Sequence, residues 1–329
     1  MSLTLKEFAK QIGYSPSTIS KALNDSKSCY TSESVKESIR KKAAELGYRP
    51  NLTARSLITQ RTNTIGLLLP SIGGFYAELV RLMEFALEER KYFGLFAFWR
   101  PEDGDAGFRN AYERIVQRGI DGIITCHYTK WLKDCHMPLV VYGNKHDDID
   151  CVFPDKFDYG RRAVDFLRKL GHRKIAFVGR REDLRFKSYR AELDANGLPF
   201  REEWACDCGL SLTAAEAAAE KISESADIPS AVLAFNDMTA YAVIHTFMKN
   251  GIRVPEDISV IGFDDLPEAK YYNPPLTTFQ HDISNVAELL VDVILKRIET
   301  PDFPLQAIPL CPDIVERASA GPCAERKRR

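Results

Sequence analysis

Residues 14–24 read Tyr14-Ser15-Pro16-Ser17-Thr18-Ile19-Ser20-Lys21-Ala22-Leu23-Asn24, and this stretch decides the fold of the first part of the chain. It predicts a short helix, because Ser15 is a favourable N-cap and Pro16 lies in the first turn, where proline is tolerated. Ile19, Ala22 and Leu23 follow at helical spacing and form one apolar face. The opposite face holds small polar side chains and one cation, so it is available to contact a partner.

The preceding residues predict a second short helix that ends at a tight turn. Thr4-Leu5-Lys6-Glu7 is a capping-box pattern, in which the Thr and Glu side chains each accept a hydrogen bond from the other residue's backbone N–H. Gly13 then interrupts the helix. Two short helices joined by a glycine-containing turn, the second with exposed hydrogen-bonding side chains, are typical of a protein that reads the DNA major groove. A small helical hairpin without a ligand is the alternative.

A third helix and a short extension complete this head. Thr31 is the expected N-cap of the third helix, and Gly47 is placed to end it. Asn51 can cap a further turn or two of helix over residues 52–58, before a polar linker over residues 59–64. So short a helix is marginal alone, and we expect it to order only when something packs against it.

The charge distribution favours the DNA interpretation over the bare hairpin. Residues 1–61 hold 11 Lys and Arg against 5 Asp and Glu, a net charge of +6, whereas the rest of the chain has a net charge of −7. The overall formal charge of −1 therefore hides a basic head on an acidic body. A basic head suits contact with phosphates, while repulsion holds the acidic body off the polyanion.

Length and composition indicate an ordinary globular protein with more than one core. The chain has 329 residues, of which 45% are hydrophobic and 28% charged, so we expect a second, larger unit of roughly 270 residues beyond the head. The start has no long apolar core and no apolar run could span a bilayer, which predicts a cytoplasmic protein without a signal peptide and without a membrane partner. The eight cysteines are scattered, which favours reduced thiols.

Three cysteine-containing segments need weighing as a possible zinc site: Cys126-His127, Cys135-His136 and Cys206-Asp207-Cys208. Adjacent Cys and His residues at the end of a strand point to opposite faces, and no paired Cys-x-x-Cys motif is present. We therefore expect no metal and no cofactor.

The body alternates short apolar runs with amphipathic stretches, which predicts α/β architecture with parallel sheets covered by helices on both faces. The expected strands are Ile65–Leu69, Phe93–Phe98, Gly122–Thr125, Leu139–Tyr142, Ile175–Val178, Ala231–Phe235 and Ile258–Phe263. The clearest helical stretches are Tyr76–Arg90, Gly160–Leu170 and Met238–Lys249. Ligands of open parallel sheets lie off the carboxyl ends of the strands, so the residues that follow strands are the candidate site.

The chain also resembles the LacI/GalR family of bacterial transcriptional regulators over nearly its full length. The head and hinge carry the resemblance in Leu5-Lys6-Glu7-Phe8-Ala9, Ser17-Thr18-Ile19-Ser20-Lys21-Ala22-Leu23-Asn24, Glu45-Leu46-Gly47-Tyr48-Arg49-Pro50-Asn51 and Ala54-Arg55-Ser56-Leu57. The body carries it in Leu170-Gly171-His172-Arg173-Lys174-Ile175-Ala176-Phe177, Phe235-Asn236-Asp237, Val254-Pro255-Glu256-Asp257-Ile258-Ser259-Val260-Ile261-Gly262-Phe263-Asp264-Asp265, Pro275-Leu276-Thr277-Thr278 and Val315-Glu316-Arg317-Ala318-Ser319.

The resemblance implies three parts and a homodimer. These are a helix-turn-helix DNA-binding domain (1–49), a hinge helix with linker (50–61) and an effector-binding and dimerisation domain (62–329). The last part should fold as two lobes like a periplasmic sugar-binding protein, with the chain crossing between them near Asp158, near Ile283 and near the C-terminus. The partners implied are a pseudo-palindromic double-stranded DNA operator and a small-molecule effector, expected to be a sugar. The residues implied in DNA binding are Thr4, Ser15, Pro16, Ser17, Thr18, Lys21, Asn24, Ala54 and Leu57, with Leu57 wedged into a base step.

Nine residues of the body are candidates for effector binding: Phe75, Tyr76, Trp99, Asn144, Arg185, Asn236, Asp237, Asp264 and His281. Most follow predicted strands, and together they offer aromatic faces for a sugar ring and polar groups for its hydroxyls. Arg185 lies in a motif of the family. Each has a structural alternative, since an Asp after a strand is commonly a helix cap, Phe75 can belong to the core and His281 can be a buried histidine.

Some positions depart from the family pattern. The loop after the first strand reads Ser71-Ile72-Gly73-Gly74, Ser188 replaces a Gly, and His281 stands where Gln is common. These departures concern the identity of the effector rather than the class of protein. The basic run 325–329 is expected to be a solvated tail, because it lacks apolar heptads.

Two other functions fit a doubly wound body. An enzyme would use Asp264, Asp265 and His281 for acid–base chemistry, but the chain has no Gly-x-Ser-x-Gly elbow and no phosphate-binding Gly-rich loop. A soluble sugar carrier would not need a basic head. We therefore expect an effector-controlled, sequence-specific DNA-binding regulator, a repressor of carbohydrate-utilisation genes, and not an enzyme.

Overall fold

A computed structural model describes residues 3–23, 31–50, 56, 59–70, 74–280, 282–311 and 313–323. The chain divides into two compact units, Met1–Thr62 and Asn63–Arg329. Within the described residues, no helix is both long and apolar enough to cross a membrane.

The first unit contains three helices around one small core: α1 (Leu5–Ile12), α2 (Pro16–Leu23) and α3 (Glu33–Glu45). The capping box forms, with Thr4 and Glu7 each accepting from the other's backbone N–H. The Ser15 hydroxyl accepts from the backbone N–H of Thr18 at 3.1 Å, as expected of a cap. The core closes with the ring of Tyr48 stacked on that of Phe8, their centroids 4.3 Å apart.

One cap in this unit differs from the sequence prediction. The N-cap of α3 is Ser32 rather than Thr31, so the helix starts at Glu33, whose negative charge suits the first turn. Gly47 has a φ of +65°, the left-handed conformation that follows a helix end. Asn24, Ala54, Leu57 and nearly all of the predicted hinge helix lie outside the described residues.

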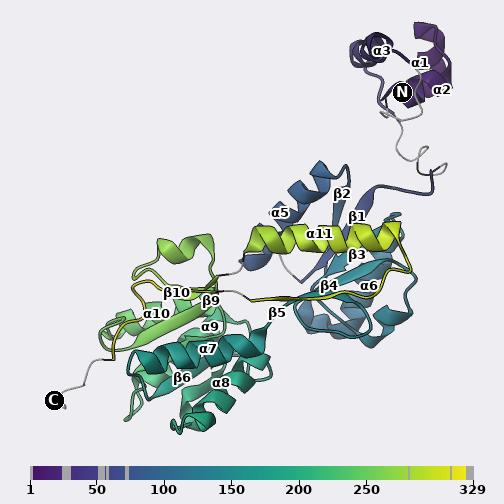
Figure 1. Cartoon of the computed structure of the whole chain (residues 1–329). Coiled ribbons are helices and arrows are strands. Elements are labelled where there is room, and N and C mark those ends of the chain that lie inside the picture. The colour runs from purple at the N-terminus through teal and green to yellow at the C-terminus, as the bar shows by residue number, and fades with distance from the viewer. Residues whose placement is uncertain are drawn as a thin grey trace. The chain divides into compact units, whose positions relative to one another are not determined.

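The second unit begins with a lobe built on a six-stranded sheet, in which the strand order β11-β5-β4-β3-β1-β2 is parallel throughout. Its strands are β1 (Thr64–Leu69), β2 (Phe93–Phe98), β3 (Gly122–Thr125), β4 (Leu139–Tyr142), β5 (Asp150–Pro154) and β11 (Ala307–Leu310). Helices α5 (Phe75–Glu89) and α11 (Ile283–Glu299) cover one face, and α6 (Gly104–Val116) covers the other (Figure 1). Alternation along β1 explains both layers, because Leu67 packs under α5 and α11 while Leu68 packs under α6.

The other lobe has a second six-stranded sheet, ordered β12-β10-β9-β8-β6-β7, in which only β12 is antiparallel to its neighbour. Its strands are β6 (Ile175–Gly179), β7 (Ala205–Asp207), β8 (Ala231–Ala234), β9 (Ser259–Asp264), β10 (Thr277–Gln280) and β12 (Asp313–Val315). Helices α7 (Lys156–Lys169) and α8 (Leu184–Ala195) cover one face, and α9 (Leu212–Ser223) and α10 (Asp237–Lys249) cover the other. Short 3₁₀ turns occupy Pro101–Asp103, Lys130–Asp134, Glu202–Trp204 and Pro267–Lys270.

The chain passes between the two sheets three times, from β5 into α7, from β10 into α11 and from β11 into β12 (Figure 1). The α/β class with two parallel-rich sheets is confirmed. Five strands escape the sequence prediction, which are β5, β7, β10, β11 and β12. Two of them have only three residues, and β5, β10 and β11 carry proline or polar residues that break the apolar run.

Candidate functional site

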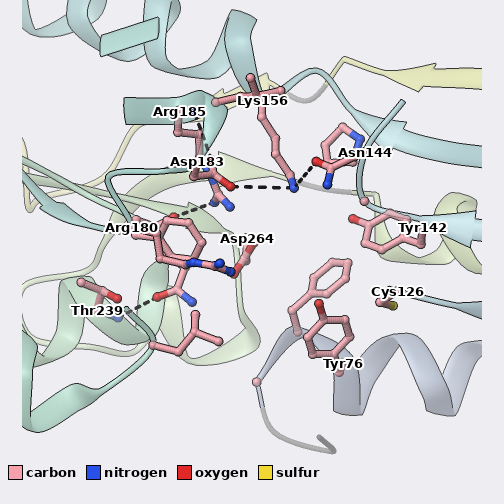
Figure 2. A pocket seen from close by; sticks show the side chains of 18 of the residues that line it. Tyr76, Cys126, Tyr142, Asn144, Lys156, Arg180, Asp183, Arg185, Thr239 and Asp264 are labelled. Atoms are coloured by element: carbon pink, nitrogen blue, oxygen red, sulfur yellow. Dashed lines mark hydrogen bonds and ion pairs between the residues drawn. The ribbon is translucent and has the colours of Figure 1, made fainter. Parts of the chain in front are cut away.

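A cavity of about 840 Å³ lies where the two sheets of the body face each other with the carboxyl ends of their strands. The first lobe contributes residues that follow β1, β3 and β4, and the second lobe contributes residues that follow β6, β8 and β9. Figure 2 shows aromatic side chains on one side of this space and charged side chains on the other. Its size falls in the range of sites for small organic ligands.

Arg185 organises the second-lobe side of the cavity from the first turn of α8. Its Nε and its backbone N–H both donate to Oδ1 of Asp183, each at 2.9 Å, and its Nη1 donates to the Phe235 carbonyl at 2.6 Å. The guanidinium also lies 3.9 Å from the centroid of the Phe235 ring. Burial alone would raise the pKa of Asp183, but the Arg185 charge lowers it below its usual range. This pair is therefore a rigid, ionised element of the cavity wall.

Lys156, the first residue of α7, connects the two lobes across the cavity. Its Nζ donates to Oδ1 of Asn144 in the first lobe at 3.0 Å and lies 3.9 Å from Oδ2 of Asp183 in the second (Figure 2). Burial, with the Arg185 charge, lowers the pKa of Lys156 to about 8. The amine is therefore mostly protonated at neutral pH, but it loses its proton at a lower pH than the amine of a surface lysine does.

Asp264 ends β9 in a conformation that few side-chain-bearing residues adopt, with a φ of +118°. Burial raises the pKa of its carboxyl to about 7, against the opposing influence of Arg185 and Lys156. Backbone strain and a carboxyl titrating near neutrality are both features that concentrate at functional sites. The carboxyl can therefore accept or donate hydrogen bonds to a bound hydroxyl near neutral pH.

The first lobe supplies an aromatic wall at the start of α5. The Phe75 ring stacks on that of Tyr142 at 5.5 Å and meets that of Tyr76 edge-on at 5.8 Å. Burial raises the pKa of the Tyr76 and Tyr142 hydroxyls, so both are neutral hydrogen-bonding groups. Flat rings with hydroxyls at their edges suit a ligand that has an apolar face and polar rim.

Six of the nine candidate effector residues line this cavity: Phe75, Tyr76, Asn144, Arg185, Asn236 and Asp264. Asn236 also caps α10, since its Oδ1 accepts from the Thr239 backbone N–H at 2.9 Å. His281 lies outside the described residues.

Two candidates are placed elsewhere by the structure, and their predicted roles need correction. Trp99 is buried in the core under α6, edge-on to Phe108, and does not line the cavity. Asp237 is fully buried behind the cavity wall, where it accepts from the Leu266 backbone N–H at 2.8 Å and from the Thr278 hydroxyl at 2.5 Å. Trp99 is large and apolar enough to belong to the core. Asp237 joins the start of α10 to the loop after β9 and to strand β10, and does not face a ligand.

Other polar residues of the cavity wall were not among the nine candidates for effector binding, and they include Cys126, Tyr142, Lys156 and Arg180. Cys126, Tyr142 and Arg180 lie at or directly after the ends of β3, β4 and β6, so the strand-end rule was sufficient to find them. Lys156 follows β5, which the apolar pattern does not reveal. Because β5 was not predicted, the strand-end rule could not identify Lys156.

The head presents a separate polar surface on α2. Ser15, Pro16, Ser17 and Lys21 are exposed, while Ile19 and Ala22 of the same helix are buried. Thr18 is half-buried and its hydroxyl lies 2.8 Å from that of Ser15, whereas Thr4 is used in the capping box of α1. This face matches the surface that the helical pattern predicts for contact with base edges.

The cysteines do not form a metal centre in the part of the chain that the structure describes. No group of three or more His, Cys, Asp or Glu side chains there is arranged to hold a metal ion. Cys206 and Cys208 are buried in the core beneath α9, and burial raises the pKa of the Cys126 thiol to about 12. Cys126 is thus a protonated thiol in the cavity wall.

Comparisons with known proteins agree with this arrangement. The profile of a periplasmic binding protein-like domain matches residues 164–320. The chain is 30% identical to the HTH-type transcriptional repressor PurR of Aliivibrio fischeri strain MJ11, over 96% of this chain and 98% of that protein. It is 29% identical to the ribose operon repressor of Escherichia coli K12, over 96% of this chain and 99% of that protein. A structure of the lac repressor dimer bound to operator and the anti-inducer ONPF has the same fold, with a TM-score of 0.86 at 22% identity, covering 98% of this chain and all of that one.

Proposed function

Because the chain belongs to the LacI/GalR family of bacterial transcriptional regulators, we propose that it represses transcription by binding a specific DNA operator, under control of a small molecule held between the two lobes of its body. The observation that carries this proposal is the pairing, in one chain, of a helix-turn-helix head with a body whose cavity is lined from both lobes. A ligand that touches both lobes favours whichever arrangement gives it more contacts, and so biases the spacing that the heads need.

The operator is read by α2 of two heads. The exposed Pro16, Ser17 and Lys21 side chains approach base edges, with Lys21 able to donate to guanine O6 and N7. Ser15, Thr18, Thr4 and Asn24 are proposed to position the head on the backbone, and Ala54 and Leu57 to act from the hinge in the minor groove. A pseudo-palindromic operator follows from the two-fold symmetry of a dimer.

The body supports the homodimer. Three phenylalanines are exposed on the first lobe, Phe85 on α5 and Phe93 and Phe96 on the edge strand β2, with exposed fractions of 50%, 59% and 39%. An exposed edge strand that carries large apolar side chains favours association with another chain. A second copy of the chain covers this strand in the proposed dimer.

The effector is proposed to be a sugar or sugar derivative, and the role of the cavity to be binding rather than catalysis. The aromatic wall of Phe75 and Tyr142 suits the apolar face of a sugar ring, and Asp264, Asn236 and Arg185 suit its hydroxyls. The ribose operon repressor, similar over its full length, is named for a sugar operon. These features support control of carbohydrate-utilisation genes.

The test starts from the full-length protein and a random-sequence DNA library. Selection should yield a pseudo-palindromic site that the wild type binds and the Lys21→Ala variant binds more weakly. A thermal-shift screen of sugars and sugar derivatives should identify a ligand that raises the melting temperature, since a ligand that binds only the folded state stabilises it. Enrichment of no sequence above background would contradict the proposal, as would a cavity ligand that leaves operator affinity unchanged.

A further inference from the structure

The cavity contains two cations, Lys156 and Arg180, whose charge is not fully neutralised by the acidic residues of the cavity wall. Arg185 is committed to Asp183 and to the Phe235 carbonyl, as described above. Arg180, which directly follows β6, is exposed in the cavity and forms no ion pair with any acidic side chain among the described residues. Lys156 donates to the Asn144 amide oxygen at 3.0 Å, lies 3.9 Å from a carboxylate oxygen of Asp183 and also interacts with the charge of Asp264. The second-lobe side therefore holds positive charge beyond what its local ion pairs need.

The position of Lys156 in the fold strengthens this charge. It is the first residue of α7, a helix of 14 residues, where the helix dipole is positive and a cation is normally disfavoured. Helices α5 and α8 also begin at residues that line the cavity, Phe75 and Leu184. Backbone N–H groups of three helix starts thus reinforce the side-chain cations.

The acidic residues of the cavity offset this charge only partly. Asp183 already accepts two hydrogen bonds from Arg185 through the oxygen that does not face Lys156. Glu182 is exposed at the rim. Asp264 is the remaining carboxyl, and its burial keeps part of its population protonated at neutral pH. An uncharged sugar would leave the charges of Lys156 and Arg180 only partly neutralised.

We propose that the effector carries an anionic group, a phosphate ester or a carboxylate, which binds between Lys156 and Arg180 while the rest of the ligand packs on the aromatic wall of Phe75 and Tyr142. This inference rests on the proposed function and narrows its effector to acidic sugar derivatives. Hydrogen bonds from a charged donor to an anion are about twice as strong as neutral ones, so each cation contributes roughly ten- to a hundredfold in affinity.

The probes are matched pairs of neutral and acidic sugars: D-ribose with D-ribose 5-phosphate, D-glucose with D-glucose 6-phosphate, and D-glucose with D-gluconate. Thermal shift on the full-length wild type ranks them, and calorimetry measures Kd for the best. We expect an acidic member to bind best, with the phosphate and carboxylate arms showing which anion is preferred. Lys156→Met and Arg180→Gln should each weaken its binding by about ten- to a hundredfold. Lys169→Met, on the exposed side of the same helix, should bind as the wild type does.

Proton uptake provides a second readout that a merely structural role would not move. Near pH 8 Lys156 is about half protonated, and a bound anion raises its pKa, so binding takes up a proton. Calorimetry in buffers of different ionisation enthalpy should show up to about half a proton more taken up by the wild type than by Lys156→Met. Subtracting the variant removes the contribution of the other titratable and charged groups that face Lys156, which are Cys126, Arg180, Asp183, Arg185 and Asp264.

The inference is overturned if a neutral sugar binds best, if no acidic member binds, or if Lys156→Met and Arg180→Gln bind the acidic ligand with the wild-type Kd. Failure of the proposed function has a different appearance. In that case the acidic ligand binds, and its affinity depends on Lys156 and Arg180 as described above. The affinity of the protein for its operator is, however, the same with and without the bound ligand.

Discussion

Replacing Arg185 tests whether the cavity wall depends on one buried ion pair. The side chains of Arg185 and Asp183 are only 9% and 12% exposed, and their charges meet at 2.9 Å. Arg185→Ala leaves the Asp183 carboxylate with the backbone N–H of residue 185 and, as its nearest cation, Lys156 at 3.9 Å, and it removes the side-chain partner of the Phe235 carbonyl. Loss of one member of a buried pair typically costs about 3–5 kcal/mol, so we expect the body to lose roughly that much stability.

Urea unfolding at a fixed protein concentration, followed by far-UV circular dichroism, measures this loss. Lys187→Ala is the matched control, since Lys187 lies on the same helix but is exposed, and its cost should stay within about 0.5 kcal/mol. The double variant Asp183→Asn/Arg185→Met should be more stable than Arg185→Ala, because it leaves no unpaired buried charge. If Arg185→Ala unfolds at the same urea concentration as Lys187→Ala, the ion pair does not support the wall and the reasoning is refuted.

Three further changes separate DNA reading, DNA bending and ligand response. Lys21→Ala should weaken operator binding by about 1–3 kcal/mol in a fluorescence-anisotropy titration, and should weaken binding to random DNA much less. Equal losses on the two DNAs would show that Lys21 contacts only phosphates. Leu57→Ala, in the hinge, should reduce operator bending in a gel-phasing assay without changing effector Kd, whereas unchanged bending would exclude the wedge. Asp264→Asn should weaken effector binding about ten- to a hundredfold by calorimetry. Burial raises the pKa of Asp264 from 3.8 to about 7, so ionisation of this carboxyl destabilises the ligand-free body progressively between about pH 4 and pH 7, and fully above pH 7. Asp264→Asn should therefore raise the melting temperature of the ligand-free body at pH 8. A lower melting temperature at pH 8 would contradict the buried environment of the carboxyl.

Local rules predict the head well, because its structure depends on neighbouring residues. The capping box of Thr4 and Glu7 and the buried face of Ile19 and Ala22 follow from spacing alone. The exception is the start of α3 at Glu33. Thr31 and Ser32 are adjacent and both suit an N-cap, so residue spacing does not show which of them caps the helix.

The cavity is less predictable, because it depends on which strand ends meet. The strand-end rule places Phe75, Asn144 and Asp264 in one site. It does not distinguish a side chain that turns toward the cavity from one that turns into the core, which is why Trp99 and Asp237 were misassigned. The interactions that decide such cases, like the bond from Thr278 to Asp237, join residues about forty positions apart and are not encoded in a local pattern.

Ligand control of DNA binding is the central claim, and one titration tests it most directly. Labelled operator is titrated with the full-length wild type and with Asp264→Asn, each with and without a saturating wild-type concentration of the cavity ligand. We predict that the ligand changes the operator Kd of the wild type by about 5- to 150-fold, the usual range of such coupling, and changes that of Asp264→Asn far less. A ligand that calorimetry shows to be bound, but that leaves the wild-type operator Kd unchanged, would contradict the account.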